Sequence, residues 1–461
     1  MMRTSAKLLP LCLVAVLAVL PACGGGGGSK TASACPVGLV DAATSPVEIK
    51  FWQAETMANA DTLLGLVDQF NASQSKIRVS ATFQGSYDES SSKYLAALRG
   101  GDVPDILQVV DWDTQRVIDS RSTVKVQDCI DATRYDTSDY LPRVLAYWQV
   151  GGDLWSYPFT AATNVLYYNA RAFEKAGLDP AKPPKTLDDL RADSRKIVDA
   201  SVARHGIALE MHSWWVENQL ARAGQAVVNN GNGRDARATE AAFDSDAGRA
   251  IFSWTKSMVD DGLALNVGRN PSGADALLAI GSGEAAMALG SSAGMRSVFA
   301  VLESGQYPDV RIGVGSMPAM PGDGGSLVGG ASLFIVNRSS PVKQEAARIF
   351  AEWLNEPEQQ AAWHIGSGYI PIRRSAAASP SVQALWSASP QFKVAYDDLS
   401  PDVVTPASAG AVVGPFLDVR SAIVGGLESM LLQGTDPAIA LRNAASTATG
   451  AIKSYNQRIG E

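Results

Sequence analysis

The chain has 461 residues, and its 47 acidic residues outnumber its 39 lysines and arginines, which gives a formal net charge of -8. This acidic balance argues against nucleic-acid binding, because neutralising phosphates requires a basic surface. With 3 histidines in the whole chain, a histidine-based metal or acid–base site is poorly supplied, and we expect neither a metal nor a cofactor. One hydrophobic core rarely organises more than about 250–300 residues, so we expect two lobes.

Residues 1–22 have the pattern of an export signal. Arg3 and Lys7 supply positive charge, and the apolar stretch that follows, 8–20, is too short to span a membrane. Leu-Pro-Ala-Cys at 20–23 has the form of a lipoprotein cleavage site. We therefore expect Cys23 to carry a lipid that anchors the exported chain to the outer face of the cytoplasmic membrane, with 23–46 as a glycine-rich flexible linker. An ordinary secretory signal with an incidental cysteine is the alternative.

Two cysteines remain once Cys12 is removed and Cys23 is lipidated. They are Cys35 and Cys129. In an oxidising compartment two such thiols favour one disulfide, which would tie the N-terminal tail to the first lobe.

Alternating strand and helix patterns follow from residue 47. Strands are predicted at 47–51, 77–83 and 106–110, with helices at 59–70 and 89–99 between them. This β-α-β-α-β order predicts an α/β fold with mostly parallel sheets flanked by helices. Further on, the pattern predicts strands at 165–169, 285–289 and after the glycines at 329–330, and helices at 172–176, from 187, and at 295–302, 344–354 and 358–364. The remainder is mostly helical.

Parallel sheets bind ligands beyond the carboxyl ends of their strands. The residues that follow the first three strands there are Trp52, Tyr87, Asp111 and Trp112. One acid and three aromatic rings, without a glycine-rich dinucleotide loop, predict a site for hydroxyl groups and ring faces rather than a pyrophosphate.

Several segments together resemble the extracellular solute-binding proteins of carbohydrate-type ABC importers, and within them the glycerol-3-phosphate-binding type. The resemblance is carried by Phe-Gln-Gly-Ser-Tyr at 83–87, Asp-Val-Pro-Asp-Ile-Leu-Gln-Val at 102–109, Leu-Tyr-Tyr-Asn at 166–169, Ala-Gly-Leu-Asp-Pro at 176–180, Pro-Pro-Lys-Thr at 183–186, Gly-Gly-Ala-Ser-Leu at 329–333, Trp-His at 363–364 and Gly-Tyr-Ile-Pro-Ile at 368–372.

The resemblance implies a type II periplasmic-binding-protein fold, in which the chain crosses three times between two lobes. We place the crossings near Thr160, Gly329 and Tyr369, which gives lobe 1 as 47–160 plus 330–368 and lobe 2 as 161–329 plus 369–461. It also implies closure of the lobes over a ligand and two permease subunits with an ATPase as partners. We expect the chain to act as a monomer and not as an enzyme.

Ligand-binding residues are carried over from the family one by one. Asp111 is expected to accept hydrogen bonds from ligand hydroxyls, a serine at 291 or 292 lies at a helix N-terminus, and a glycine at 329 or 330 offers backbone at close range. The full set implied is Trp52, Tyr87, Asp111, Trp214, Trp215, Ser291, Ser292, Gly329, Gly330 and Tyr369.

One position departs from the glycerol-phosphate-binding pattern. The arginine that grips the phosphate in that group aligns with Val412, which cannot make a bidentate contact. Arg420, Arg373 or Arg374 are the substitutes, unless they are surface charges. Glycerol-3-phosphate, a glycerophosphodiester and an uncharged saccharide therefore all stay open as ligands.

Three other functions compete with solute binding. Gly-Ser-Ser-Ala-Gly at 290–294 fits the nucleophile motif of serine hydrolases, with Ser292 as nucleophile and His364 later in the chain. Asp111 with Glu217 is a candidate glycosidase carboxylate pair. A purely structural surface lipoprotein is the third, and the motifs at strand ends count against it.

Overall fold

The computed structural model describes residues 35–269, 274–322 and 324–460. The predicted export signal, Cys23 and the first part of the linker lie outside the described residues. Among the helices that are described, none is long and apolar enough to cross a membrane.

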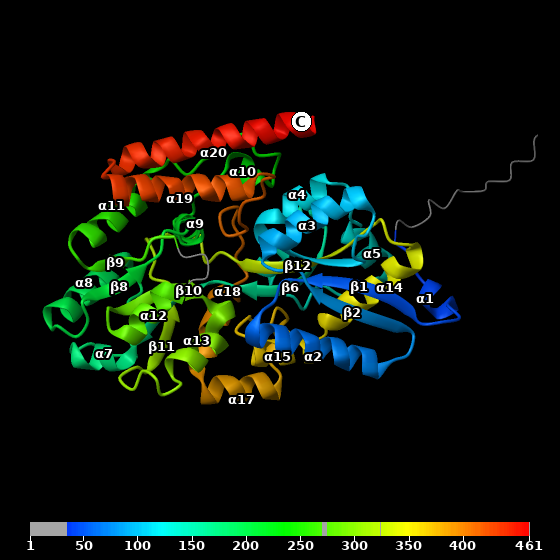
Figure 1. Ribbon diagram of the computed structural model, residues 1–461, viewed down its shortest axis with the longest axis horizontal. Helices are drawn as coiled ribbons and strands as arrows, with labels where there is room; N and C mark the ends of the chain where they lie inside the picture. Colours follow the sequence, from blue (N-terminus) through cyan, green and yellow to red (C-terminus); the bar gives the residue numbers. More distant parts are fainter. Residues whose placement is uncertain (1–34, 270–273, 323, 461) are drawn as a thin grey trace, which may run out of the picture. The chain divides into compact units, whose positions relative to one another are not determined.

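Two five-stranded sheets form the centre of the fold (Figure 1). The first has the order β2-β1-β3-β12-β6 and the second β11-β7-β10-β8-β9. The strands of the first are β1 Val47–Gln53, β2 Ile77–Phe83, β3 Ile106–Val110, β6 Tyr157–Ala162 and β12 Gly329–Ile335, and those of the second are β7 Asn164–Asn169, β8 His205–Leu209, β9 Ala264–Asn266, β10 Ala285–Ser291 and β11 Ile312–Ser316. We call the part built on the first sheet lobe 1 and that on the second lobe 2. The predicted two-lobed α/β fold is confirmed.

Four of the five strands in each sheet run in the same direction, as expected for mostly parallel sheets, and one strand runs against them. In lobe 1 the β1–β2 and β1–β3 pairs are parallel, whereas β12 is antiparallel to both β3 and β6. In lobe 2 the β8–β10 and β8–β9 pairs are parallel, whereas β7 is antiparallel to both β10 and β11. The reversed strands, β7 and β12, are those by which the chain enters each lobe directly from the other. They start at the edge between the lobes, whereas strands reached through crossover helices end there.

The chain passes between the sheets at three places. Thr163 alone separates β6 from β7, and β11 in lobe 2 is followed by β12 in lobe 1. The third passage follows α15, because α15 packs on α2 beside the first sheet whereas α18 packs on β7 and β11.

Helices cover both lobes. Those before β6 are α1 Leu39–Ala42, α2 Met57–Ser73, α3 Tyr87–Gly100, α4 Thr114–Asp119, α5 Val126–Thr133 and α6 Pro142–Trp148. Those between β7 and β11 are α7 Ala170–Lys175, α8 Leu187–Asp199, α9 Ser213–Arg222, α10 Asn229–Gly233, α11 Asp246–Asp260, α12 Ala274–Ser282 and α13 Met295–Leu302. Those after β12 are α14 Pro341–Leu354, α15 Pro357–Gly366, α16 Arg374–Ala377, α17 Pro380–Ala388, α18 Val394–Leu399, α19 Phe416–Gln433 and α20 Pro437–Ile459.

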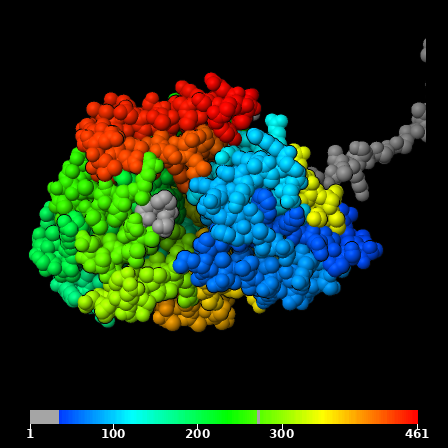
Figure 2. Space-filling view, viewed as in Figure 1, coloured from blue at the N-terminus to red at the C-terminus, as the bar shows by residue number. Residues whose placement is uncertain are grey.

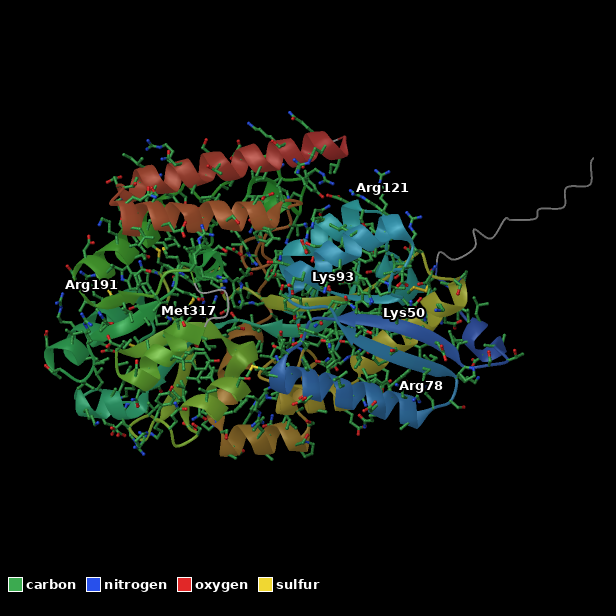
Figure 3. All side chains as sticks on the ribbon, in the orientation of Figure 1. Lys50, Arg78, Lys93, Arg121, Arg191 and Met317 are labelled. Carbon is green, nitrogen blue, oxygen red and sulfur yellow. A yellow bond between two sulfur atoms is a disulfide. The ribbon has the colours of Figure 1, made fainter. Side chains whose placement is uncertain are left out.

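Local sequence explains where many of these helices start and stop. Ser86 and Thr186 each form a capping box, with Glu89 and Asp189 respectively, at the first turns of α3 and α8. α19 and α20 pack side by side (Figure 1), and their orange and red surfaces border both the green and the cyan parts of the chain in Figure 2. Two of the charged side chains labelled in Figure 3 are held by ion pairs: Lys50 on β1 pairs with Asp102, and Arg191 on α8 pairs with Asp261.

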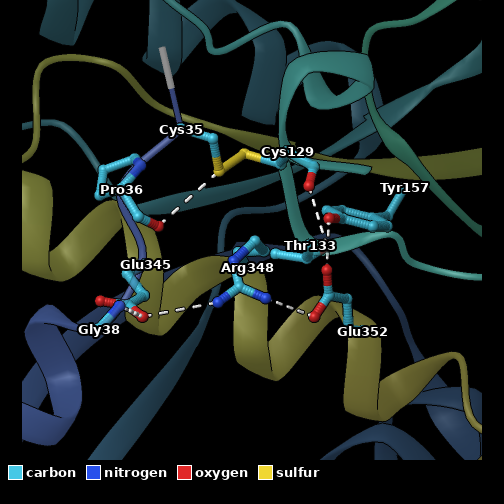
Figure 4. Close-up of a disulfide and its surroundings, with 9 residues drawn as sticks. All are labelled: Cys35, Pro36, Gly38, Cys129, Thr133, Tyr157, Glu345, Arg348 and Glu352. Atoms are coloured by element: carbon cyan, nitrogen blue, oxygen red, sulfur yellow. Dashed lines mark hydrogen bonds and ion pairs between the residues drawn. A yellow bond between two sulfur atoms is a disulfide. The ribbon is translucent and has the colours of Figure 1, made fainter. Parts of the chain in front are cut away.

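The N-terminal arm is held against lobe 1 by covalent and polar contacts (Figure 4). Cys35 and Cys129 form a disulfide with a Cα–Cα distance of 4.9 Å, so the predicted pair is present. The Glu345 carboxylate then accepts hydrogen bonds from the backbone N–H groups of Gly38 and Leu39, both at 2.6 Å, at the start of α1. The linker therefore joins the folded body at lobe 1.

Candidate functional site

A pocket of about 160 Å³ lies where the strand ends of the two sheets face each other. Its walls come from the segments after β2, β3 and α15, the ends of β6 and β10, the start of β12, the start of α9, and α19. The lining residues are Tyr87, Val110, Asp111, Trp112, Ala162, His212, Trp214, Ser291, Ala293, Gly329, Gly330, Tyr369 and Arg420. A larger hollow of about 450 Å³ lies between α19 and α20 and is lined mainly by small side chains. The smaller pocket is the better candidate, because it joins strand ends, aromatic rings and buried charges from both lobes.

Seven of the ten residues predicted from the sequence line this pocket. They are Tyr87, Asp111, Trp214, Ser291, Gly329, Gly330 and Tyr369. Chain positions from 87 to 369 are thus brought together by the three passages between the lobes.

The other three predicted residues do not line it. Trp52 still belongs to β1, because this strand ends one residue later, at Gln53. The Trp52 ring packs on the hydrophobic cluster that contains Tyr94 and Leu107. Trp215 is 4% exposed and belongs to the core below α9, because successive residues of a helix point about 100° apart and only Trp214 faces the pocket. Ser292 is fully buried at the first passage between the lobes, where its Oγ accepts a hydrogen bond from Thr163 N at 3.3 Å.

A buried cluster of three charged groups joins the two lobes at the pocket. The Arg420 guanidinium, on α19, donates to both Glu217 carboxylate oxygens at 2.8 Å, and to both Asp111 oxygens at 3.4 and 3.5 Å. The side chains of Arg420, Asp111 and Glu217 are 8%, 3% and 1% exposed. With both acids ionised, the cluster carries one net negative charge.

The electrostatic balance of this cluster is set by burial and by the ion pairs. Burial raises the pKa of Asp111, and the charge of Glu217 raises it further. The positive charge of Arg420 opposes this shift. Burial alone would lower the pKa of Arg420, but the two carboxylates outweigh it and raise that pKa. Burial lowers the pKa of His212 to about 4, with a further contribution from Arg420, so the imidazole is neutral at pH 7.

Arg420 corrects the expectation about the missing arginine. Val412 lies away from the pocket, in the lining of a separate cavity of about 220 Å³. Arg420 is no surface charge. Arg374, by contrast, is 43% exposed and pairs with Asp402, and Arg373 stacks on the rings of Tyr135 and Tyr140. The sequence could have indicated that Arg420 is buried, because helical spacing puts it on the same face of α19 as Phe416, Val419 and Ile423.

A second polar network holds the pocket tyrosines, and it contains a residue that sequence reasoning missed. Tyr87 Oη donates to Glu55 Oε1 at 3.0 Å and lies 3.4 Å from Tyr369 Oη. Gln108 Nε2, from β3, also donates to Glu55 Oε1 at 2.7 Å. Burial raises the pKa of Glu55, while the hydrogen bonds from Gln108 and Tyr87 oppose the shift. Glu55 lies two residues after the end of β1, and this position just beyond a strand end could have marked it as a pocket residue from the sequence.

Two tryptophans complete the walls. Trp112 lies with its ring 4.8 Å from the Arg420 guanidinium and makes an edge contact with Tyr87. Trp214 packs on Gly329, where an added Cβ would stand 2.4 Å from Trp214 Cζ2. Among the described residues, Trp214 Nε1 is buried without a hydrogen-bond partner. Flat aromatic rings beside hydrogen-bonding groups suit a solute that has apolar faces as well as hydroxyl groups.

The residues proposed for the two rival reactions are already engaged. His364 is buried, with Nδ1 2.7 Å from Tyr369 O and Nε2 accepting from Trp386 Nε1 at 2.9 Å, so it is not poised as a base for Ser292. Asp111 and Glu217 share Arg420 rather than flanking an open space. Within the described part of the chain, no group of three His, Cys, Asp or Glu side chains could hold a metal ion.

Sequence comparison defines the class of protein. Residues 65–393 match the family described as bacterial extracellular solute-binding protein. The match covers well over half of the chain, and the chain belongs to this family.

Curated relatives match over nearly the whole length. The sn-glycerol-3-phosphate-binding periplasmic protein UgpB of Yersinia pestis is 28% identical over 424 residues, which are 90% of this chain and 94% of that protein. UgpB of Escherichia coli O6:H1 is 28% identical over 438 residues, covering 93% and 98% of the two chains.

Solved structures share the fold. UgpB from Mycobacterium tuberculosis in complex with glycerophosphocholine has a TM-score of 0.73 at 21% identity, covering 90% of this chain and all of that one. The sugar-binding protein MalE from Xanthomonas citri has a TM-score of 0.74 at 19% identity, with the same coverage. The family and the fold therefore both indicate an exported, two-lobed solute-binding protein.

Proposed function

We propose that this chain is the receptor of an ABC importer, which captures a small polyhydroxylated solute in the pocket between its lobes and delivers it to two permease subunits driven by an ATPase. The observation that carries the proposal is the pocket itself. Aromatic rings from both lobes stand beside a buried Asp111–Arg420–Glu217 cluster, at the strand ends where α/β folds bind ligands.

The favoured ligands are glycerol-3-phosphate and glycerophosphodiesters. The UgpB relatives are named for glycerol-3-phosphate, and one structural relative holds glycerophosphocholine. The choice rests on these relatives, because the guanidinium that Arg420 brings to the pocket is already bound by Glu217 and Asp111. Its bidentate bond to Glu217 directs the remaining interactions of the guanidinium toward Asp111 and the ring of Trp112.

A saccharide is the second candidate ligand. Several structural relatives are described with sugars, among them a cyclic maltosyl-maltose-binding protein from Arthrobacter globiformis with a TM-score of 0.72. The carboxylates and tyrosines of the pocket can accept and donate hydrogen bonds to sugar hydroxyls, and Trp112 and Trp214 offer faces for a ring.

Closure and anchoring complete the proposal. Passages at Thr163, between β11 and β12, and after α15 form a three-stranded hinge about which the lobes close over the solute. The lipid on Cys23 and the linker hold the receptor at the membrane, where it acts as a monomer. It binds its solute without turning it over.

Thermal denaturation and calorimetry test the proposal with glycerol-3-phosphate, glycerophosphocholine and maltose as probes. A ligand at about 100 times its Kd adds about 2.7 kcal/mol to the free energy of unfolding, so the midpoint rises measurably. Glycerophosphocholine or glycerol-3-phosphate is expected to give the largest rise and to be recovered unchanged. No response to any probe, together with turnover of an ester or glycoside substrate, would reject the receptor function.

A further inference from the structure

A turn of unusual backbone conformation in lobe 2 carries an arginine toward lobe 1. Asn230, Gly231 and Asn232 all have left-handed backbone angles, with φ values of 53°, 61° and 63°. Such angles cost free energy for a residue that has a Cβ, so they persist only where the surroundings enforce them. The buried Asn232 side chain does so. Its Oδ1 accepts from Val227 N at 2.7 Å, and its Nδ2 donates to Pro406 O at 2.9 Å.

The residue that this turn directs is Arg234. All five N–H groups of its guanidinium donate to backbone carbonyl oxygens. Three of the acceptors lie at the C-terminal end of α6 in lobe 1, which are Ala146 O at 2.8 Å, Gln149 O at 2.6 Å and Tyr147 O at 3.0 Å. The other two are Gly410 O at 2.8 Å and Ala409 O. Helix ends leave carbonyls without partners and carry partial negative charge, so a cation is well matched there.

The end of α6 leads directly to the binding pocket. Tyr147 is 4% exposed, and its Oη donates to Asp111 Oδ2 at 2.9 Å. Its ring is confined by Gly410, where an added Cβ would stand 2.4 Å from Tyr147 Cε2, and lies 5.9 Å from the Arg234 guanidinium. Asp111 in turn contacts Arg420. Arg234 is thus connected to the charged cluster of the pocket through a single helix end.

A second tie starts from the same turn. The Arg237 guanidinium donates to both Asp119 carboxylate oxygens, at 2.7 and 3.1 Å, and Tyr455 Oη on α20 donates to Asp119 at 2.9 Å. Asp119 ends α4, and Asp111 begins the short 3-10 turn just before α4. The segment 111–119 of lobe 1 is therefore held by lobe 2 at both of its ends.

We propose that the segment 229–237, which contains this turn and both arginines, is a clamp between the lobes, and that Arg234 is a positioning residue for the binding pocket, acting through Tyr147 on Asp111. The inference rests on the proposed function, because it assigns the clamp an effect on solute affinity. A purely structural Arg234 would change the unfolding temperature and leave the affinity of the folded protein alone.

A double-mutant cycle separates these two roles. Arg234→Met, Tyr147→Phe and the double variant are titrated with glycerophosphocholine by calorimetry, at a temperature where each is fully folded. We expect each single variant to bind about tenfold more weakly, and the double variant no more weakly than the worse single one, because both changes act on one chain of contacts. Arg249→Met, which removes an exposed arginine of α11 in the same lobe, is the matched control and should leave the affinity unchanged.

Two results would overturn the proposal. They are an Arg234→Met protein that binds as tightly as the parent, and losses of affinity that add in the double variant. If Arg234→Met does not fold, Gly410→Ala, whose new Cβ displaces the Tyr147 ring, takes its place in the same cycle with the same expectation. If the parent binds no probe, the clamp is judged on unfolding temperatures alone, and the proposed function fails if an ester or glycoside substrate is also turned over. Non-additive shifts for Arg234→Met and Tyr147→Phe would then support the clamp, and additive shifts would reject it.

Discussion

Replacing Arg420 by methionine tests how the pocket keeps two carboxylates buried. The change removes the cation that Asp111 and Glu217 share, while the methionine fills much of the same volume. Breaking a buried ion pair by removing one partner costs about 3–5 kcal/mol, because the remaining charge is left uncompensated. All three side chains here are at most 8% exposed, so solvent does not screen the loss. We therefore expect Arg420→Met to lower the free energy of unfolding by about 3–5 kcal/mol near neutral pH.

The loss should depend on pH with a definite sign. Burial already raises the pKa of Asp111 in the parent, and Arg420 opposes that shift. Without Arg420 the pKa of Asp111 rises further above its value in the unfolded chain. The folded variant then binds more protons than the unfolded one, so its stability increases as the pH falls. The deficit relative to the parent should accordingly shrink between about pH 7.5 and pH 5.5.

Urea denaturation at the two pH values measures both effects. Arg374→Met is the control, because that arginine is 43% exposed and pairs with a carboxylate that is 70% exposed. Exposed pairs contribute at most about 1 kcal/mol, so the control should unfold nearly like the parent. The double variant Arg420→Met/Glu217→Met should recover part of the stability by removing one buried charge. An Arg420→Met protein as stable as the parent at the higher pH, or a deficit that does not change with pH, would refute this account of the cluster.

Three further changes test the pocket wall, the N-terminal arm and the proposed membrane anchor. Gly329→Ala places a Cβ 2.4 Å from the Trp214 ring, so we expect at least a tenfold loss of affinity (about 1.4 kcal/mol) in a tryptophan-fluorescence titration with glycerophosphocholine. Cys129→Ser opens a covalent loop that spans 94 positions, which in the chain-entropy treatment lowers the free energy of unfolding by up to about 4.7 kcal/mol, measured by urea denaturation. Cys23→Ser should move the protein from the membrane fraction to the soluble fraction of the cell envelope, measured by fractionation and immunoblotting.

Each of these variants has its own control. Gly100→Ala, at a helix position with open space around the new Cβ, should keep the parental affinity, and a Gly329→Ala protein that binds normally would contradict the role of Trp214 as a wall. A reductant should lower the stability of the parent but not of Cys129→Ser, and equal responses would mean that the disulfide does not stabilise the fold. Continued membrane attachment of Cys23→Ser would show that another feature anchors the chain.

The sequence by itself determined the elements and the strand ends. Periodicity located β1, β2 and β3, and the rule that α/β ligands lie beyond strand ends selected Tyr87 and Asp111. The prediction that Cys12 belongs to an export signal and Cys23 to a lipid anchor was sufficient to pair Cys35 with Cys129. These inferences depend on local patterns and on the chemistry of single residues, which are encoded in order along the chain.

Only the tertiary structure decided which side chains face the pocket. Trp214 and Trp215 are neighbours in sequence, yet one lines the pocket and the other the core, because the direction of each depends on how α9 packs. Arg420 and Glu217 lie 203 positions apart, and an ion pair at such a separation leaves no local trace. The mixed order of both sheets likewise follows from where the chain passes between the lobes. The physical reason is the same in each case: a pocket between two lobes is made by long-range packing, whereas sequence patterns report only the neighbours of a residue along the chain.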